Sequence, residues 1–116
     1  MMRGLAGKSA IVTGGGRGIG AAIATRFGEE GVKVAIYDID GETAAATAQT
    51  ICDAGGDAHG VEVDLIDYDA VKTAVSDTNA AQGLNIVVNN AGWDQFIPFI
   101  DTDPEFWGKV IDINYR

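Results

Sequence analysis

The sequence predicts an α/β fold in which a doubly wound parallel sheet carries helices on both faces. Strand-like apolar runs alternate with segments of helical periodicity along the chain, which is the pattern of βαβ units. A glycine-rich turn separates the first apolar run from the first helical segment. We expect one domain over residues 1–116. Right-handed crossovers on either side of the first strand then give the strand order 3-2-1-4.

The first half of the chain predicts two strands and two helices, over residues 8–12, 18–30, 32–37 and 41–54. Gly31 follows the first helix as a C-cap, and Asp40 precedes the second as an N-cap. Apolar residues of the first helix fall on one stripe: Ile19, Ala22, Ile23 and Phe27. We expect Cys52 on the inner stripe of the second helix, where it would pack against the sheet.

The second half predicts a third strand over 58–63 and a helix capped by Asp67 that ends near Gly83. Leu84 to Asn89 is an almost continuous apolar run, as expected of a strand that is buried on both faces. Asp103-Pro104 predicts the start of a further helix. Its inward residues would be Phe106, Val110 and Ile111.

Composition excludes several function classes. The chain of 116 residues has a net charge of −9 and no basic cluster, which argues against binding to nucleic acid or to anionic membranes. No apolar run approaches the length of a membrane span, and the N-terminus lacks a secretory signal. One cysteine and one histidine predict neither a disulfide framework nor a metal site. We expect a cytoplasmic protein.

The glycine-rich turn between the first strand and helix is the strongest functional signal. Such a turn lets backbone N–H groups and a helix N-terminus face a pyrophosphate. No Lys-Ser or Lys-Thr follows its last glycine, which excludes a P-loop. Asp38 ends the second strand, where a carboxylate accepts hydrogen bonds from ribose hydroxyls. Two spacings fit the turn, Gly16-x-Gly18-x-x-Ala21 and Thr13-Gly14-x-x-x-Gly18-x-Gly20.

The second spacing, together with Asn89-Asn90-Ala91-Gly92 after the fourth strand, resembles the compact short-chain dehydrogenases/reductases. Extended members of that family space their glycines differently, and Arg17 stands where they need one. The resemblance runs from Gly7-Lys8 to Asn114. It implies a Rossmann-type fold, and it implies that residues 1–116 are the N-terminal portion of a larger domain, truncated before the remaining strands.

The resemblance also implies a role for each matching residue. The pyrophosphate turn would comprise Thr13, Gly14, Gly15, Gly16, Arg17, Gly18, Ile19 and Gly20, with Ile19 toward the nicotinamide. Asp38 would bind the adenosine ribose, and Asp64 with the Leu65 backbone would bind the adenine. The ribose would also be lined by Asn90, Ala91 and Gly92. Asn114 would be the active-site asparagine that supports the proton relay from a helix.

The implied reaction is hydride transfer between NAD and a secondary alcohol or ketone. In the family a serine and a Tyr-x-x-x-Lys pair supply the acid–base chemistry, and we expect residues 1–116 alone to be inactive without them. Tyr68 and Lys72 satisfy that spacing, but they open the helix after the third strand, so we interpret them as a chance match. Full-length members are expected to form homo-oligomers. Asn-Asn-Ala-Gly-Trp-Asp (89–94) is weakly similar to dehydrogenases of alicyclic hydroxyacyl-CoA thioesters.

Cofactor preference depends on two residues that act in opposite directions. A basic residue in the turn, here Arg17, often accompanies NADP in this family. The Asp38 carboxylate would repel a 2′-phosphate at close range, and Ile39 follows it rather than an arginine. We therefore predict NAD. The alternative function is a non-catalytic dinucleotide-binding or sensing module on the same fold, which would have no use for Asn114.

Overall fold

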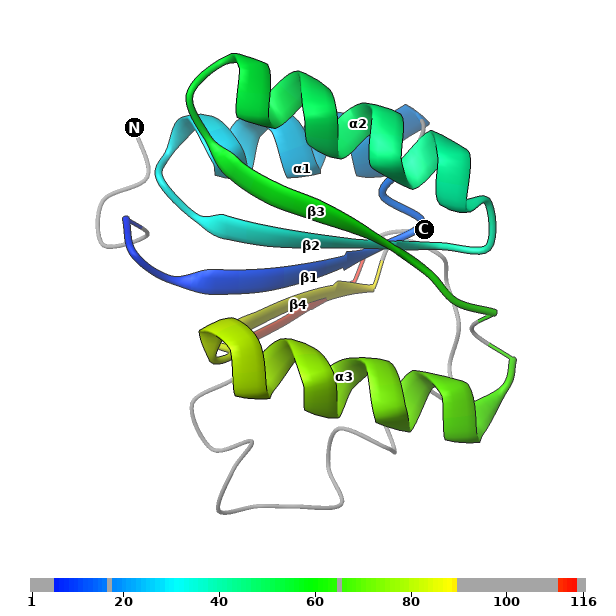
Figure 1. The fold of residues 1–116 in the computed structure, drawn as a ribbon. Coiled ribbons are helices and arrows are strands. Elements are labelled where there is room, and N and C mark those ends of the chain that lie inside the picture. The colour runs from blue at the N-terminus through cyan, green and yellow to red at the C-terminus, as the bar shows by residue number, and fades with distance from the viewer. Residues whose placement is uncertain (1–5, 17, 65, 90–110, 115–116) are drawn as a thin grey trace.

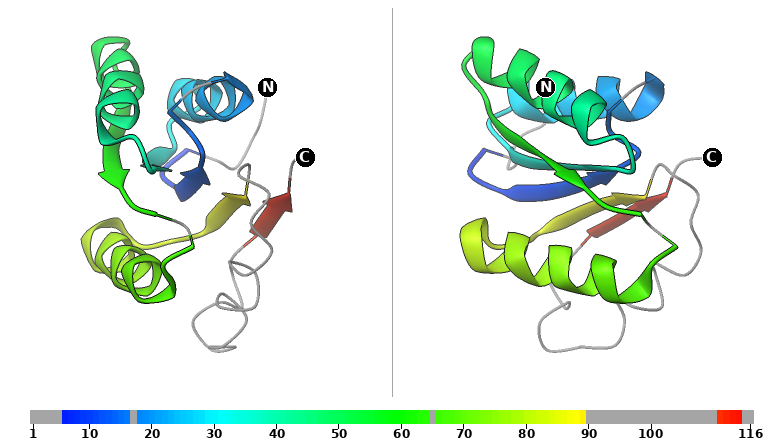
Figure 2. Two further views of the ribbon diagram at one scale, coloured as in Figure 1. Left: turned by 90° about the vertical axis from the view of Figure 1, so that its right-hand side faces the viewer. Right: turned by 45° about the vertical axis from the view of Figure 1, so that its right-hand side comes forward.

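The computed structural model describes residues 6–16, 18–64, 66–89 and 111–114. It contains a five-stranded sheet in the order β3-β2-β1-β4-β5, with every neighbouring pair parallel (Figures 1 and 2). The strands are β1 (Ser9–Thr13), β2 (Lys33–Asp38), β3 (Asp57–Glu62), β4 (Ile86–Asn89) and β5 (Ile111–Asn114). The helices are α1 (Gly18–Glu29), α2 (Gly41–Asp53) and α3 (Tyr68–Gln82). The predicted order 3-2-1-4 is confirmed.

Helices cover both faces of the sheet, so the sheet is the middle of three layers. Figure 1 shows α1 and α2 above it and α3 below it. Side chains alternate along each strand: Ala10 and Val12 of β1 pack toward α1 and α2, whereas Ile11 packs toward α3. Each face therefore has its own apolar core. β1, β2 and the apolar residues 86–88 of β4 are buried, as the apolar run 84–89 predicted for β4, whereas β3 is largely exposed.

Local capping signals located the helices correctly. The Asp40 carboxylate accepts from the Thr43 N–H at 3.1 Å and begins α2. The Asp67 carboxylate accepts from the Ala70 N–H at 3.1 Å and begins α3. Gly31, at φ +84°, follows α1 as the left-handed residue that ends it. Element bounds agree with the predicted ranges to within about two residues.

Predicted burial was wrong for Ile19 and Ala22 of α1 and for Cys52 of α2, all of which are exposed. Ile19 is 62% exposed, because the residues of α1 that face the core are Gly20, Ala24, Phe27 and Gly28. Small residues occupy that face because α1 packs closely on α2: a Cβ added at Gly28 would overlap Ile51. Cys52 is exposed rather than packed inward, and its thiol donates to the Ala58 carbonyl at 3.3 Å. Ile51, one position earlier on α2, takes the buried place.

The predicted helix after Asp103-Pro104 needs a correction at its end. Residues 103–110 lie outside the described part, but Ile111 does not face inward from a helix, because residues 111–114 form β5. Ile111 and Ile113 are β-branched and alternate with polar residues, which favours a strand. β5 pairs with β4 from Ile86↔Ile111 to Asn89↔Asn114. The outer backbone groups of β4 thus have a neighbouring strand.

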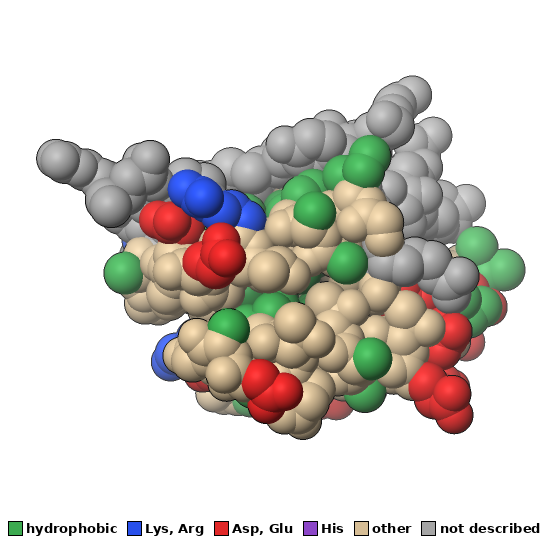
Figure 3. All heavy atoms as spheres, turned by 90° about the horizontal axis from the view of Figure 1, so that it is seen from above, with side chains coloured by type: hydrophobic (Ala, Val, Ile, Leu, Met, Phe, Trp, Pro, Cys, Tyr) green, Lys and Arg blue, Asp and Glu red, His purple; other side chains and the backbone are tan. Residues whose placement is uncertain are grey.

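The outer face formed by α1 and α2 carries no single charged patch. Figure 3 shows acidic side chains in several separate places on this face, interleaved with small hydrophobic ones. Arg26 and Glu30 form an i,i+4 ion pair at 3.3 Å. This dispersed pattern is typical of a solvated surface. Within the described residues, no helix is both long and apolar enough to span a membrane.

Candidate functional site

The glycine turn joins the carboxyl end of β1 to α1. Gly14 and Gly18 have φ values of +64° and +61°, in the left-handed region that favours glycine. The Gly14 N–H donates to the Tyr37 carbonyl at 2.7 Å, which ties the start of the turn to β2. Gly14 and Gly18 therefore both depend on the conformational freedom of glycine. The turn places the N-terminus of α1 at the edge of the sheet where β1 and β2 end (Figure 1).

Gly16 is the most closely packed residue of this turn. A Cβ added there would lie 2.7 Å from Asp38 Oδ2, 2.9 Å from Thr43 Cγ2 and 3.1 Å from the Ala44 nitrogen. Its N–H donates to Asp38 Oδ2 at 3.1 Å. Only a glycine lets the turn approach β2 and α2 this closely, so the motif is required by packing as well as by conformation.

Asp38 connects the turn to the end of β2. The residue is 7% exposed, and each carboxylate oxygen accepts a backbone N–H: Oδ2 from Gly16 and Oδ1 from Asp40, the latter at 3.0 Å. A carboxylate offers about four lone-pair sites, so two such bonds leave acceptor capacity for hydroxyl donors. The structure thus places the Asp38 carboxylate beside the glycine turn, and its predicted contact with the adenosine ribose stays a prediction.

Other turn residues have structural contacts. The Thr13 hydroxyl is buried and donates to the Val88 carbonyl at 3.3 Å, which links β1 to β4. A Cβ added at Gly15 would lie 2.9 Å from Ile36 Cγ2. Gly20 is buried in α1, whereas Ile19 projects outward. An exposed Ile19 is compatible with its predicted place beside the nicotinamide, although it contradicts the predicted stripe.

Asp64 lies at the same edge of the sheet as Asp38. The Val63 N–H donates to the Asp38 carbonyl at 3.0 Å, so the chain enters the β3–α3 connection directly beside Asp38. Asp64 is half-buried, and its Oδ1 accepts from the Ile66 N–H at 3.1 Å. The structure therefore brings the predicted ribose and adenine carboxylates, Asp38 and Asp64, to the carboxyl ends of two neighbouring strands, β2 and β3.

Of the remaining predicted site residues, the structure describes only the backbone of Asn114. Arg17, Leu65, Asn90, Ala91 and Gly92 lie outside the described residues. The Asn114 backbone is placed opposite that of Asn89 in the β4–β5 register. The helical setting expected for Asn114 was wrong, because its backbone is paired in a sheet. Its catalytic role stays a prediction.

Two tyrosines lie within the described part, and neither is placed for acid–base catalysis at the turn. Tyr68 begins α3, on the face of the sheet opposite α1 and α2, and is 44% exposed (Figure 1). Tyr37 is fully buried in β2, and its hydroxyl lies 2.5 Å from Thr78 Oγ1. Burial raises the pKa of Tyr37 above its ordinary value, so it stays neutral. The interpretation of Tyr68 and Lys72 as a chance match remains the preferred one.

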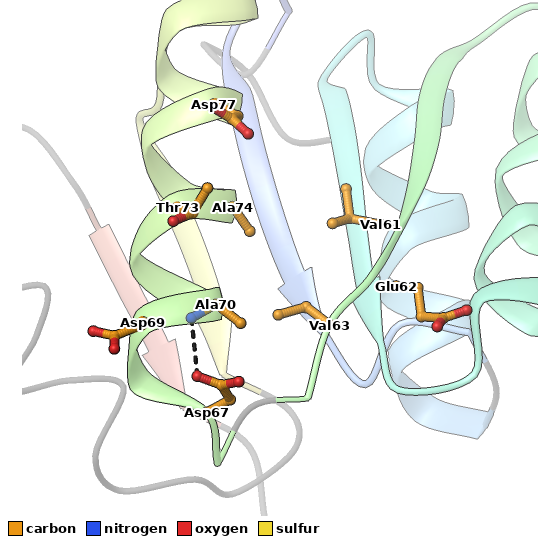
Figure 4. Close-up of a pocket in the computed structure, with 9 residues that line it drawn as sticks. All are labelled: Val61, Glu62, Val63, Asp67, Asp69, Ala70, Thr73, Ala74 and Asp77. Atoms are coloured by element: carbon orange, nitrogen blue, oxygen red, sulfur yellow. Dashed lines mark hydrogen bonds between the residues drawn. The ribbon is translucent and has the colours of Figure 1, made fainter.

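A groove of about 600 Å³ lies between β3 and α3, away from the glycine turn. Among the described residues, its lining includes Glu62, Asp67, Asp69 and Asp77 and no lysine or arginine. Figure 4 shows Ala70, Ala74 and Val63 facing the space between the two elements, with Asp67 capping α3 through the Ala70 N–H. An anionic pyrophosphate would be repelled by this lining, so the groove is a poor candidate for the dinucleotide.

Sequence reasoning missed one contributor to the turn. The Thr47 hydroxyl of α2 donates to the Gly16 carbonyl at 2.8 Å, across 31 positions of the chain. Thr43, on the same helix, also lies beside the turn, because its Cγ2 would be 2.9 Å from a Cβ added at Gly16. A threonine within an alanine-rich helix gives no local signal of such a contact. It becomes visible only when α2 is packed beside the turn.

Comparison with known proteins agrees with this geometry. The family model for short chain dehydrogenase matches residues 8–116. A 2,5-dichloro-2,5-cyclohexadiene-1,4-diol dehydrogenase from Sphingobium indicum is 40% identical over 111 residues, covering 95% of this chain and 44% of the relative. A 3beta-hydroxysteroid dehydrogenase from Eggerthella lenta is 42% identical over 113 residues, covering 95% and 43%.

A solved structure extends the comparison to three dimensions. The crystal structure of a metagenomic short-chain oxidoreductase in complex with NADP superposes with a TM-score of 0.72 at 40% identity, covering 76% of this chain and 40% of that one. The chain thus spans less than half of the length of the relatives it matches. Its sheet order, its glycine turn and its sequence lead to one conclusion: the chain belongs to the short-chain dehydrogenase/reductase family of oxidoreductases.

Proposed function

We propose that this chain is the cofactor-binding part of an NAD-dependent oxidoreductase acting on a secondary alcohol or its ketone. The observation that carries the proposal is the Asp38 carboxylate, buried at the end of β2 and hydrogen-bonded to Gly16 of the glycine turn. A turn of backbone N–H groups and an adjacent fixed carboxylate match the two ends of an adenosine diphosphate: an anion and a pair of hydroxyl donors.

The described residues fit a dinucleotide by their chemistry. Gly18 places no side chain in the open space beside the turn, where an added Cβ would meet nothing within 4 Å, and Gly14 and Gly18 both adopt positive φ values. Asp38 offers acceptor capacity to the ribose, and Asp64 offers it to the adenine amino group. When bound, the nicotinamide ring supplies the hydride acceptor or donor of the reaction. The serine and Tyr-x-x-x-Lys pair of the family would be supplied by segments outside residues 1–116.

NAD rather than NADP is the proposed cofactor. A 2′-phosphate would be placed beside the Asp38 carboxylate, where like-charge contact costs several kcal/mol because the residue is only 7% exposed. The relative crystallised with NADP shows that a structural neighbour binds the phosphorylated cofactor. In this chain Arg17 favours NADP, and we give Asp38 more weight because its charge is fixed by two backbone hydrogen bonds.

The proposed substrate class is a secondary alcohol carried on a ring. Two relatives, 40% and 42% identical to this chain, are named for a cyclohexadiene diol and for a hydroxysteroid, which supports a cyclic alcohol as substrate. The narrower hydroxyacyl-CoA possibility rests on residues 89–94, of which residues 90–94 lie outside the described part. It is not needed for the proposal.

Cofactor titration of the full-length protein tests the proposal. The wild type should bind NAD more tightly than NADP by at least about tenfold. The double variant Asp38→Ala, Ile39→Arg should reverse the preference, because it removes the repulsion and adds a phosphate partner. Ile66→Arg is the matched control, since Ile66 and Ile39 are both exposed, at 77% and 67%, after neighbouring strands. A wild type that prefers NADP would show that Arg17 outweighs Asp38.

A further inference from the structure

The side chain of Thr47 forms a hydrogen bond between helix α2 and the glycine turn. Its hydroxyl donates to the Gly16 carbonyl at 2.8 Å, and the residue is half-buried. Two other helical threonines behave differently: Thr25 donates to Ala21 at 2.8 Å and Thr50 to Ala46 at 3.1 Å, each four residues back in its own helix. That local bond is the usual one for a helical threonine. Thr47 instead donates to the carbonyl of Gly16 in the glycine turn.

Together, Thr47 and Asp38 hold both polar groups of Gly16. Asp38 accepts the Gly16 N–H at 3.1 Å, and Thr47 donates to its carbonyl. Because a peptide is planar, holding the carbonyl fixes the plane of the peptide that leads from Gly16 toward α1. Thr43 and Ala44 of α2 leave no room for a Cβ at Gly16, so α2 also lies close to this part of the turn.

We propose that Thr47 is a positioning residue of the cofactor site, acting through Gly16. The inference rests on the proposed function, because it assigns the hydroxyl a task in dinucleotide binding: it holds the turn in the orientation that a pyrophosphate needs. Preorganisation of this kind strengthens binding by removing the cost of ordering the turn when the ligand arrives. Thr47 itself need not touch the dinucleotide.

The test compares four variants by calorimetry with NAD, ADP-ribose and adenosine on the full-length protein. Thr47→Val keeps the shape and removes the hydroxyl, and should weaken NAD and ADP-ribose about fivefold while leaving adenosine within about twofold. Thr47→Ser should restore binding. Thr50→Val, the same change at an exposed position of the same helix, should leave all three ligands unchanged. Thr47→Ala is measured alongside, because it adds no methyl group beside the Gly16 carbonyl.

The ligand series separates positioning from a loss of fold. A general structural defect would weaken adenosine together with the diphosphates, and serine would not rescue them selectively. Equal NAD affinities in Thr47→Val and Thr50→Val would overturn the positioning role and leave the proposed function standing. A wild type that binds neither NAD nor NADP would overturn the proposed function and this inference with it.

Discussion

The junctions after β2 and after β3 are built alike and differ in what they touch. Each has an aspartate whose Oδ1 accepts the N–H two residues on: Asp38 from Asp40 at 3.0 Å, and Asp64 from Ile66 at 3.1 Å. Each then has an aspartate that caps the next helix, Asp40 for α2 and Asp67 for α3. Asp38 differs because its second oxygen accepts the Gly16 N–H, which joins it to the turn after β1.

The difference shows that position in the sheet, rather than local sequence, joins one junction to the glycine turn, where the cofactor site is proposed. β2 lies beside β1, whose carboxyl end carries the glycine turn, so Asp38 meets that turn. β3 is the outer strand, and its junction borders a groove lined by carboxylates. The same type of capped junction thus joins the glycine turn through Asp38 in one place, whereas in the other it carries Asp64, the proposed adenine ligand, beside an acidic groove.

The largest loss of NAD affinity should follow from adding a side chain at Gly16. In Gly16→Ala the added Cβ would lie 2.7 Å from Asp38 Oδ2 and 3.1 Å from the Ala44 backbone nitrogen, so the turn must move. We expect NAD affinity to fall by more than about tenfold, because a displaced turn no longer fits the pyrophosphate. Isothermal titration with NAD checks this expectation.

Gly55→Ala provides the matched control for that change. Gly55 also has a positive φ, +95°, so an alanine there is strained. Nothing lies within 4 Å of an added Cβ, and Gly55 is remote from the glycine turn. This variant should lose about 1 kcal/mol of stability and keep its NAD affinity. Equal affinities in the Gly16→Ala and Gly55→Ala proteins would contradict the special role of Gly16.

The smallest loss of stability should follow from changes at the helix caps, Asp40 and Asp67, in which the two junctions are alike. Asp40→Ala and Asp67→Ala each remove a carboxylate that accepts one N–H at 3.1 Å, and each should cost about 1 kcal/mol in urea unfolding. Asp40→Asn and Asp67→Asn retain a capping oxygen and should cost less. A loss confined to one junction would show that the two caps are not equivalent.

Much of this architecture is predictable from the sequence, because the signals are local. Asp40, Asp67 and Gly31 located helix ends, and the apolar runs located strands whose order follows from chain chirality. Predictions failed where a long-range contact decides the outcome. The burial of Ile51 in place of Cys52 depends on how closely α1 approaches α2, and β5 depends on pairing with β4. The Thr47 contact with Gly16 is of the same long-range kind.

The central claim is that NAD binds at the β1–β2 edge, between the glycine turn and Asp38. Hydrogen–deuterium exchange of the full-length protein, with and without saturating NAD, tests it most directly. We predict that NAD slows exchange in the segments 13–20 and 38–44 and leaves residues 69–77 of α3 unchanged. Protection confined to 69–77, with the turn and the start of α2 exchanging as before, would place the ligand at the β3–α3 groove and contradict the account.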